Sequence, residues 1–257
     1  MRPVLVCDLS IAANYKSPAQ RARVMSEHWF ARNCYCLACE TDRLLPAVAN
    51  TKAMDFSCNN CGHQYELKTF VKRPTKSLVD GAYAALMSRI QSNSAPTLCL
   101  LERNDGWQIR GLTAIHSSFI TAWVVERRKP LGENARRAGW VGCNIRLDRI
   151  PPDGEIAVID AGICRTKSEV RRQFKRFLPL ADLSPDQRGW TTLTLTIIRN
   201  LGKPVFSLGD LYERERQFSV AYPANRHVRP KIRQQLQVLR DLGVVSFEGS
   251  GVYVLVT

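Results

Sequence analysis

The chain has 257 residues, 45% hydrophobic and 23% charged, which is ordinary for a soluble globular protein of one or two domains. No apolar run approaches the roughly eighteen residues that span a bilayer, so a transmembrane protein is excluded. The formal net charge of +14 favours a polyanionic partner, most commonly nucleic acid, over a basic protein without such a partner.

The positive charge is spread along the chain. Residues 1–183 hold 27 basic and 17 acidic residues, and residues 184–257 hold 10 and 6, giving net charges of +10 and +4. No single tail therefore explains the excess, and an extended nucleic-acid surface does.

Cysteine usage indicates a reducing compartment. The nine cysteines are an odd number, and Met1–Asp8 is too short and too soon interrupted for a signal peptide. We therefore expect a cytoplasmic protein with no membrane partner, in which four cysteines bind a metal and five are free thiols.

Helices and strands alternate in the first part of the chain. Ser17-Pro18-Ala19-Gln20 has the pattern of a helix start with a capping box, and that helix should run to about Ala31. A period of four predicts a helix over Ser77–Gln91. Strands are expected at Met54–Ser57, Gln64–Phe70, Thr97–Glu102 and Ile156–Asp160. This order favours a mixed α/β sheet.

A loop-rich basic region, Glu126–Trp140, and a helix over Arg165–Arg176 follow, and Leu180–Ser184 has the composition of a domain boundary. The last part of the chain is predicted to contain three helices and a hairpin: Trp190–Asn200, Leu208–Glu215, Val228–Leu242, and the strands Val244–Phe247 and Val252–Val256. The fold class is therefore α+β, with a domain over 1–183 and a winged helix over 184–257.

Two CxxC pairs predict a structural zinc site. Cys36, Cys39, Cys58 and Cys61 have the spacing of a four-thiolate zinc site. Free thiols or a redox pair are the alternative. Cys34 and His63 lie near enough to substitute, but all four regular positions are occupied. A closed four-thiolate site leaves no place for water, so this zinc should hold structure and perform no chemistry.

Asp55 and Glu66-Leu67-Lys68 match the D…(D/E)xK pattern of a large nuclease superfamily. Residues two apart on a strand share a face, so Glu66 and Lys68 should lie together while Leu67 points into the core. We expect Mg²⁺ at Asp55, Glu66 and Leu67, where it would activate water for attack on a phosphate, and Lys68 to orient that water or help deprotonate it. A solvated strand edge is the alternative, which the zinc-clipped turn and the basic charge disfavour.

The predicted third C-terminal helix has a buried stripe of Ile232, Leu236, Leu239 and Leu242. Four residues lie mostly elsewhere on the helix and suit base recognition in a major groove: Arg229, Arg233, Gln234 and Gln237. A charged face on a protein–protein module is the alternative.

A glycine-rich basic loop carries Arg136, Arg137 and Trp140. The arginines can hold phosphates while the indole packs on a base or a methyl group. From the residues alone, a tryptophan that anchors the loop to the core is the more frequent case.

Several segments resemble the DpnI-like family of methyl-directed type II restriction endonucleases. The segments are Tyr15–Ser17, Asp55–Cys61, Glu66–Lys68, Asp80–Ala84, Ala135–Ile145 and Lys231–Asp241. The similarity covers nearly the whole chain, but the residues before Tyr15 are not recognisably similar, and Pro230 precedes the matched helix.

The resemblance implies a PD-(D/E)xK-type nuclease domain with a zinc-clipped hairpin, followed by a winged helix that also recognises methylated DNA. It implies cleavage of double-stranded GATC only where the adenine is methylated. Asp55, Glu66 and Lys68 would then be catalytic, the four cysteines would bind zinc, and Trp140 would contact the methyl groups. We expect such an enzyme to be a monomer in solution. The rival hypotheses are a non-catalytic methyl-DNA reader or transcription regulator, and an RNA-binding zinc protein.

Overall fold

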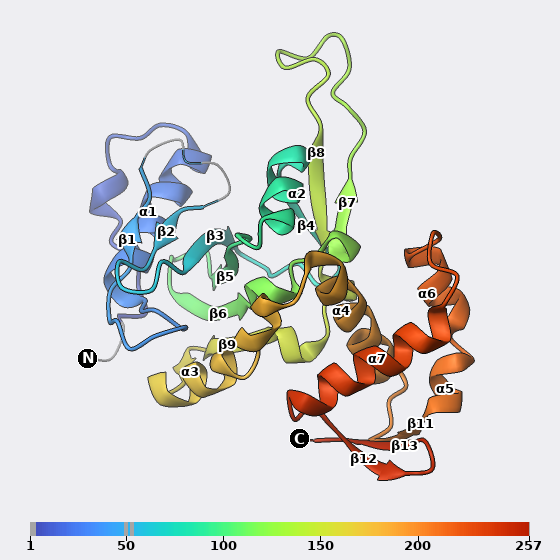
Figure 1. Cartoon of the computed structure of the whole chain (residues 1–257). Helices are drawn as coiled ribbons and strands as arrows, with labels where there is room; N and C mark the ends of the chain where they lie inside the picture. Colours follow the sequence, from blue (N-terminus) through green and yellow to red (C-terminus); the bar gives the residue numbers. More distant parts are fainter. Residues whose placement is uncertain (1–3, 49–50, 52–53, 257) are drawn as a thin grey trace.

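The structure is a computed structural model that describes residues 4–48, 51 and 54–256 (Figure 1). Its main sheet has seven strands in the order β1-β2-β3-β5-β6-β9-β10. These strands are β1 (Leu45–Pro46), β2 (Phe56–Ser57), β3 (Gln64–Phe70), β5 (Thr97–Arg103), β6 (Ile109–Ile115), β9 (Glu155–Asp160) and β10 (Ile163–Cys164). Only β3 and β5 pair in parallel, so the sheet is mixed, as expected.

The main sheet separates two hydrophobic clusters, and β5 shows why. Its first five residues are all buried. Leu98 and Leu100 pack into one cluster, and Cys99 and Leu101 pack into the other. A strand buried on both faces needs a continuous apolar run, which is what the sequence has there.

Two helices complete the cluster that contains Cys99. They are α1 (Pro18–Asn33) and α3 (Lys167–Lys175), which contribute Met25, Trp29, Phe30, Val170 and Phe174. Helix α1 begins at the predicted proline, but the Ser17 side chain makes no capping hydrogen bond, so the expected capping box does not form.

The predicted helix over Ser77–Gln91 is wrong in its first half. Residues Ser77–Ala82 form strand β4, and only Tyr83–Gln91 form helix α2. Leu78 and Asp80 are buried while Val79 and Gly81 are exposed, so the burial period there is two. Antiparallel pairing with β8 therefore outweighs the helical period of the apolar residues.

Strand β4 belongs to a second sheet, ordered β4-β8-β7, with β8 at Gly142–Arg146 and β7 at Val125–Arg127. Neither β7 nor β8 was predicted from the sequence. Residues 128–139, between them, are exposed apart from half-buried Ala135, and the loop projects far from the body of the molecule (Figure 1). The basic region Glu126–Trp140 is therefore mostly the arm between two paired strands.

Helix α4 (Pro185–Asn200) begins five residues before the predicted start. Ser184 and Gln187 form a capping box ahead of it, with Pro185 at the first helical position. Every residue from Arg188 to Ile198 is buried, because the helix packs against α7 and against the short helices Ser117–Phe119 and Ala122–Val124. One continuous cluster therefore joins the C-terminal elements to the first part of the chain.

The C-terminal part is a winged helix. It contains β11 (Val205–Ser207), α5 (Leu208–Tyr212), α6 (Glu215–Ala221), α7 (Val228–Asp241), β12 (Val245–Gly249) and β13 (Val252–Leu255), with strand order β11-β13-β12. The expected helix and hairpin at α7, β12 and β13 are confirmed. The helix predicted over Leu208–Glu215 begins as expected but ends at Tyr212, and β11 and α6 were not predicted. Further 3-10 turns lie at Ser10–Ala12, Leu147–Arg149, Pro152–Gly154 and Leu178–Asp182.

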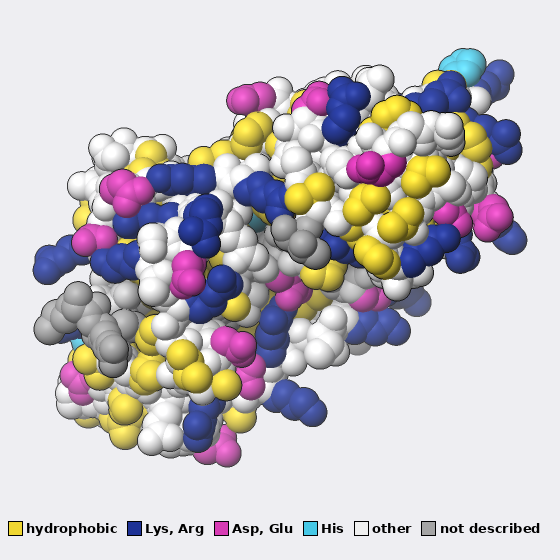
Figure 2. Space-filling view, turned by 90° about the horizontal axis from the view of Figure 1, so that it is seen from below, with side chains coloured by type: hydrophobic (Ala, Val, Ile, Leu, Met, Phe, Trp, Pro, Cys, Tyr) yellow, Lys and Arg dark blue, Asp and Glu magenta, His cyan; other side chains and the backbone are white. Residues whose placement is uncertain are grey.

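The face shown in Figure 2 is not a continuous basic surface. Lys and Arg side chains are interspersed there with Asp, Glu and hydrophobic side chains. This view is from the side opposite the β7–β8 loop of Figure 1. Among the described helices, none combines the length and apolar character needed to cross a membrane.

His116 predicts how stability depends on pH. It is fully buried, lies 4.1 Å from the Phe174 ring centroid, and accepts a hydrogen bond from the Ser118 amide at 3.1 Å. Burial lowers the pKa of His116 to about 3. The folded state therefore holds the neutral ring, and stability is lost as pH falls below the unfolded pKa of roughly 6.5.

We expect this group alone to lower the free energy of unfolding by about 2 kcal/mol between pH 7 and pH 5. Urea unfolding of wild type and His116→Asn at both pH values measures this, since Asn keeps an acceptor for the Ser118 amide. An equal pH dependence in both proteins would contradict the assignment.

Candidate active site

A short hairpin brings the predicted acidic residues together. In it, β2 pairs antiparallel with β3, with Phe56 opposite Tyr65. The Asp55 amide also donates to the Tyr65 carbonyl at 2.9 Å, which extends the pairing by one residue. The intervening turn carries Cys58 and Cys61, and its Gly62 has a φ of +72°, which favours glycine.

The four predicted cysteines form one cluster. The sulfur atoms of Cys36, Cys39, Cys58 and Cys61 all lie within 4.8 Å of one another. The Cys36–Cys61 and Cys39–Cys58 Sγ distances are both 3.6 Å. Four thiolates at about 2.3 Å from a tetrahedral zinc would lie roughly 3.8 Å apart, so the cluster has the size and chemistry to hold zinc.

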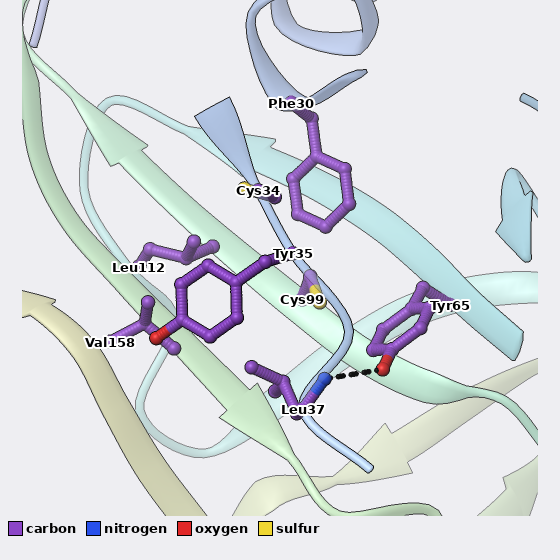
Figure 3. A pocket seen from close by; sticks show the side chains of 8 residues that line it. All are labelled: Phe30, Cys34, Tyr35, Leu37, Tyr65, Cys99, Leu112 and Val158. Atoms are coloured by element: carbon purple, nitrogen blue, oxygen red, sulfur yellow. Dashed lines mark hydrogen bonds between the residues drawn. The ribbon is translucent and has the colours of Figure 1, made fainter. Parts of the chain in front are cut away.

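Neighbouring side chains fix the segment that bears the first CxxC pair. The Tyr65 hydroxyl accepts from the Leu37 amide at 2.9 Å (Figure 3). It also contacts Cys36 Sγ at 3.2 Å. From α3, buried Arg171 donates to the Cys36 carbonyl at 3.0 Å and to the Glu40 carboxylate at 2.6 Å. Strand β3 and helix α3 therefore hold the cluster from two sides.

Cys34 and His63 are not part of this cluster. Cys34 lines a small cavity of about 10 Å³ together with Phe30, Tyr35 and Cys99 (Figure 3). The His63 ring is hydrogen-bonded to the Thr97 hydroxyl at 2.8 Å. Both side chains are thus engaged elsewhere, and the four-cysteine set stands as the sequence spacing indicated.

Asp55, Glu66 and Lys68 lie side by side. The Leu67 amide donates to Asp55 Oδ2 at 2.8 Å, which places the Asp55 carboxylate against β3. Lys68 Nζ is 2.6 Å from Glu66 Oε1. Leu67 packs toward the hydrophobic cluster instead, as the alternation of a strand requires, so it can offer only its backbone carbonyl to an ion.

Asp80 also belongs to this group, although the sequence analysis assigned it no role. Its Oδ1 atom lies 2.6 Å from Lys68 Nζ, and its side chain is 2% exposed. In the predicted helix over Ser77–Gln91, Asp80 would have had no neighbour in β3. The two-residue alternation of Ser77–Ala82 was the signal that could have identified it.

The charges of this group are strongly coupled. Burial raises the pKa of Glu66 to about 7; Lys68 opposes this shift, and Asp80 and Asp55 add to it. Burial alone would lower the pKa of Lys68, but the Glu66 and Asp80 carboxylates raise it above its ordinary value. The Lys68 ammonium contacts the carboxylates of Glu66 and Asp80, and the Asp55 carboxylate also acts on Glu66, so the group has an excess of negative charge that attracts a cation.

The residues fit a hard divalent cation. Glu66 Oε2 is buried and has no hydrogen-bond partner among the described residues. A buried carboxylate oxygen without a partner is costly, and a cation ligated by Glu66 and Asp55 would satisfy it.

The predicted DNA-contacting residues of the β7–β8 loop occupy two environments. Arg136 and Arg137 are exposed near the loop tip, whereas Trp140 is half-buried at its base. The Arg137 guanidinium lies 4.9 Å from the Trp140 ring centroid. The indole therefore packs at the loop base and still presents part of its surface.

All four predicted recognition residues of α7 are exposed, but they differ in their contacts. Arg229 is hydrogen-bonded to Glu215 at 2.8 Å, and Arg233 is hydrogen-bonded to the Tyr212 hydroxyl at 2.9 Å. The side chains of Gln234 and Gln237 are exposed to solvent. Gln234 also lines an open groove with Arg226, His227 and Lys231.

The chain matches two family models. Residues 4–182 match the family described as DpnI, the Dam-replacing family. Residues 186–254 match the Dam-replacing HTH domain. Together the two matches cover both the group around Glu66 and the winged helix.

The cysteine cluster predicts one zinc ion per chain and a large stability loss without it. Apparent zinc binding energies in such sites are roughly 10 kcal/mol or more, and removing one thiolate forfeits much of that. Metal analysis and thermal unfolding of Cys58→Ser, with Cys34→Ser as the matched control, measure this. Zinc-free wild-type protein that unfolds like the purified protein would contradict a structural zinc.

Proposed function

We infer the function of this chain from its family. The chain belongs to the Dam-replacing (DpnI) family, and membership of this family implies a methyl-dependent restriction endonuclease. We propose that it makes Mg²⁺-dependent double-strand cuts in DNA at GATC sites whose adenine is methylated. The observation that carries this proposal is the buried Glu66 carboxylate: its Oε1 atom contacts Lys68, its Oε2 atom has no partner among the described residues, and Asp55 is held at the amide of the next residue, Leu67.

Asp55 and Glu66 would hold the Mg²⁺ through carboxylate oxygens, with the Leu67 carbonyl as a third ligand. When bound, the ion would supply charge stabilisation at the scissile phosphate and lower the pKa of a bound water. Lys68, a cation with three donors, would orient that water and balance charge on the phosphate. Its two carboxylate partners hold the ammonium in place before substrate arrives.

We assign DNA reading to two surfaces. The β7–β8 loop would approach the methylated site, with Arg136 and Arg137 on phosphates and Trp140 against the methyl groups. Helix α7 would present Arg229, Arg233, Gln234 and Gln237 to base edges. The basic residues of the groove beside Gln234 support a phosphate contact at the start of that helix.

We further propose a nuclease domain over residues 1–183, a winged-helix domain over 184–257, and a monomer in solution. The boundaries of the two family matches support the division. Zinc at the four cysteines would keep the turn between β2 and β3 closed. The cluster fits a structural role because all four ligands come from the protein.

The proposed function predicts that plasmid DNA is cut according to its methylation. With Mg²⁺, plasmid from an adenine-methylating host should be cut and plasmid from a non-methylating host should not. Lys68→Ala should lower the cleavage rate at least about a hundredfold, because a charge aimed at the reacting phosphate is lost. Its affinity for methylated duplex should stay within about twofold.

Lys72→Ala, which changes a lysine four residues further along the chain, is the control and should cut like wild type. Equal cutting of both plasmids would contradict the proposed specificity for methylated DNA. Tight binding without strand breaks in any divalent metal would instead identify a non-catalytic reader of methylated DNA.

A further inference from the structure

The loop proposed to meet the DNA and the lysine of the candidate active site are connected through one small sheet. Strand β8 follows the loop directly and pairs with β4, where Asp80 lies opposite Cys143 and Ala82 opposite Gly142. Asp80 in turn contacts Lys68 at 2.6 Å. Only three strands make up this sheet, so its members cannot shift independently without breaking their pairing.

The connection begins at Trp140. A β-carbon built on Gly142 would lie 2.8 Å from two ring atoms of Trp140, so the indole lies directly on the Gly142 backbone. A displacement of the indole would therefore also displace Gly142, the first residue of β8.

The connection continues across a backbone irregularity in β4. The register shifts between Asp80 and Ala82, which places Gly81 at the bulge. The Tyr83 amide donates to the Val141 carbonyl at 3.1 Å, and the Cys143 thiol contacts the Gly81 carbonyl at 3.5 Å. The bulge is thus hydrogen-bonded on both sides to the segment Val141–Cys143, which directly follows Trp140, and Asp80 is the residue before the bulge.

Asp80 differs from Glu126, the other acidic residue in the strands of this sheet. The Glu126 side chain is 45% exposed and lies 3.7 Å from Arg146. The Asp80 side chain is almost completely buried and is directed at the ammonium. A buried charge pair of this kind fixes position, and a misplacement of about 1 Å at a reacting group can cost roughly a hundredfold in rate.

We propose that Asp80 is a positioning residue that couples Trp140 to Lys68. Contact of the indole with DNA then changes the rate of cleavage as well as the affinity for DNA. The coupling rests on the proposed function, because it needs a cleavage reaction to act on. It places part of the methyl preference in the rate of cleavage.

A double-mutant cycle tests the coupling. Single-turnover cleavage at saturating DNA gives the rate, and binding in EDTA gives the affinity, for wild type, Asp80→Asn, Trp140→Ala and the double variant. Asp80→Asn should cut methylated DNA at least about tenfold more slowly, with affinity within about twofold of wild type. Trp140→Ala should lower both rate and affinity in the wild-type background, but only affinity in the Asp80→Asn background.

Two further variants sharpen the cycle. The Gly142→Ala substitution, whose β-carbon would displace the indole from the Gly142 backbone, should lower the cleavage rate of the wild-type protein. It should leave the cleavage rate of Asp80→Asn unchanged. Asp80→Asn should also narrow the ratio of methylated to unmethylated cleavage rates while the binding preference persists. Glu126→Gln, an exposed acid of the same sheet, should match wild type in all measurements.

Rate losses that multiply in the double variant would overturn the coupling, since Asp80 and Trp140 would then act independently. If Asp80→Asn does not fold, Asp80→Glu keeps the charge but displaces it by one methylene. The same slowed rate and the same insensitivity to Trp140→Ala are then expected, and multiplying losses overturn the coupling there too. Failure of wild type to cut methylated DNA would reject the proposed function itself, whereas normal cutting with multiplying losses would reject only the coupling.

Discussion

The pairing of β2 with β3 is the constraint on which the candidate site depends. Because the turn between these strands carries Cys58 and Cys61, closing the cysteine cluster also fixes Asp55 against the β3 backbone. The position of the Asp55 carboxylate relative to Glu66 is thereby set before any substrate or ion arrives. Helix α3 supports the same arrangement from outside through Arg171. The candidate zinc site is in this way connected to the candidate active site.

The charges around Lys68 are the second constraint on the candidate site. Lys68 is the ammonium between Glu66 and Asp80, and the remaining oxygen of Glu66 has no partner in the described part of the chain. Such a group is poorly satisfied alone and well suited to a hard cation. The neighbouring sheet supplies Asp80 and carries the long basic loop on its other strands, so the same element serves chemistry and DNA approach.

Patterns local in sequence were predicted well, and patterns that depend on pairing were not. Each CxxC pair, the β3 strand and helix α7 has its signal within one short stretch of the sequence. Asp80 was missed because its neighbours β8 and Lys68 are distant in sequence, and the apolar spacing of Leu78 and Ala82 resembled a helix. Gln235 illustrates the same limit: among polar residues of α7 it is fully buried, where Thr191 of α4 donates to it at 2.7 Å.

The central claim is that Asp55 and Glu66 share one divalent cation. The most direct test uses protein that holds zinc at the four cysteines but no metal at the carboxylates. Mn²⁺ is titrated into this protein, and electron paramagnetic resonance measures how much Mn²⁺ is bound. The account predicts one Mn²⁺ per wild-type chain, with affinity lowered at least about tenfold in Asp55→Asn and in Glu66→Gln alike. Undiminished Mn²⁺ binding in either variant would contradict a shared ion.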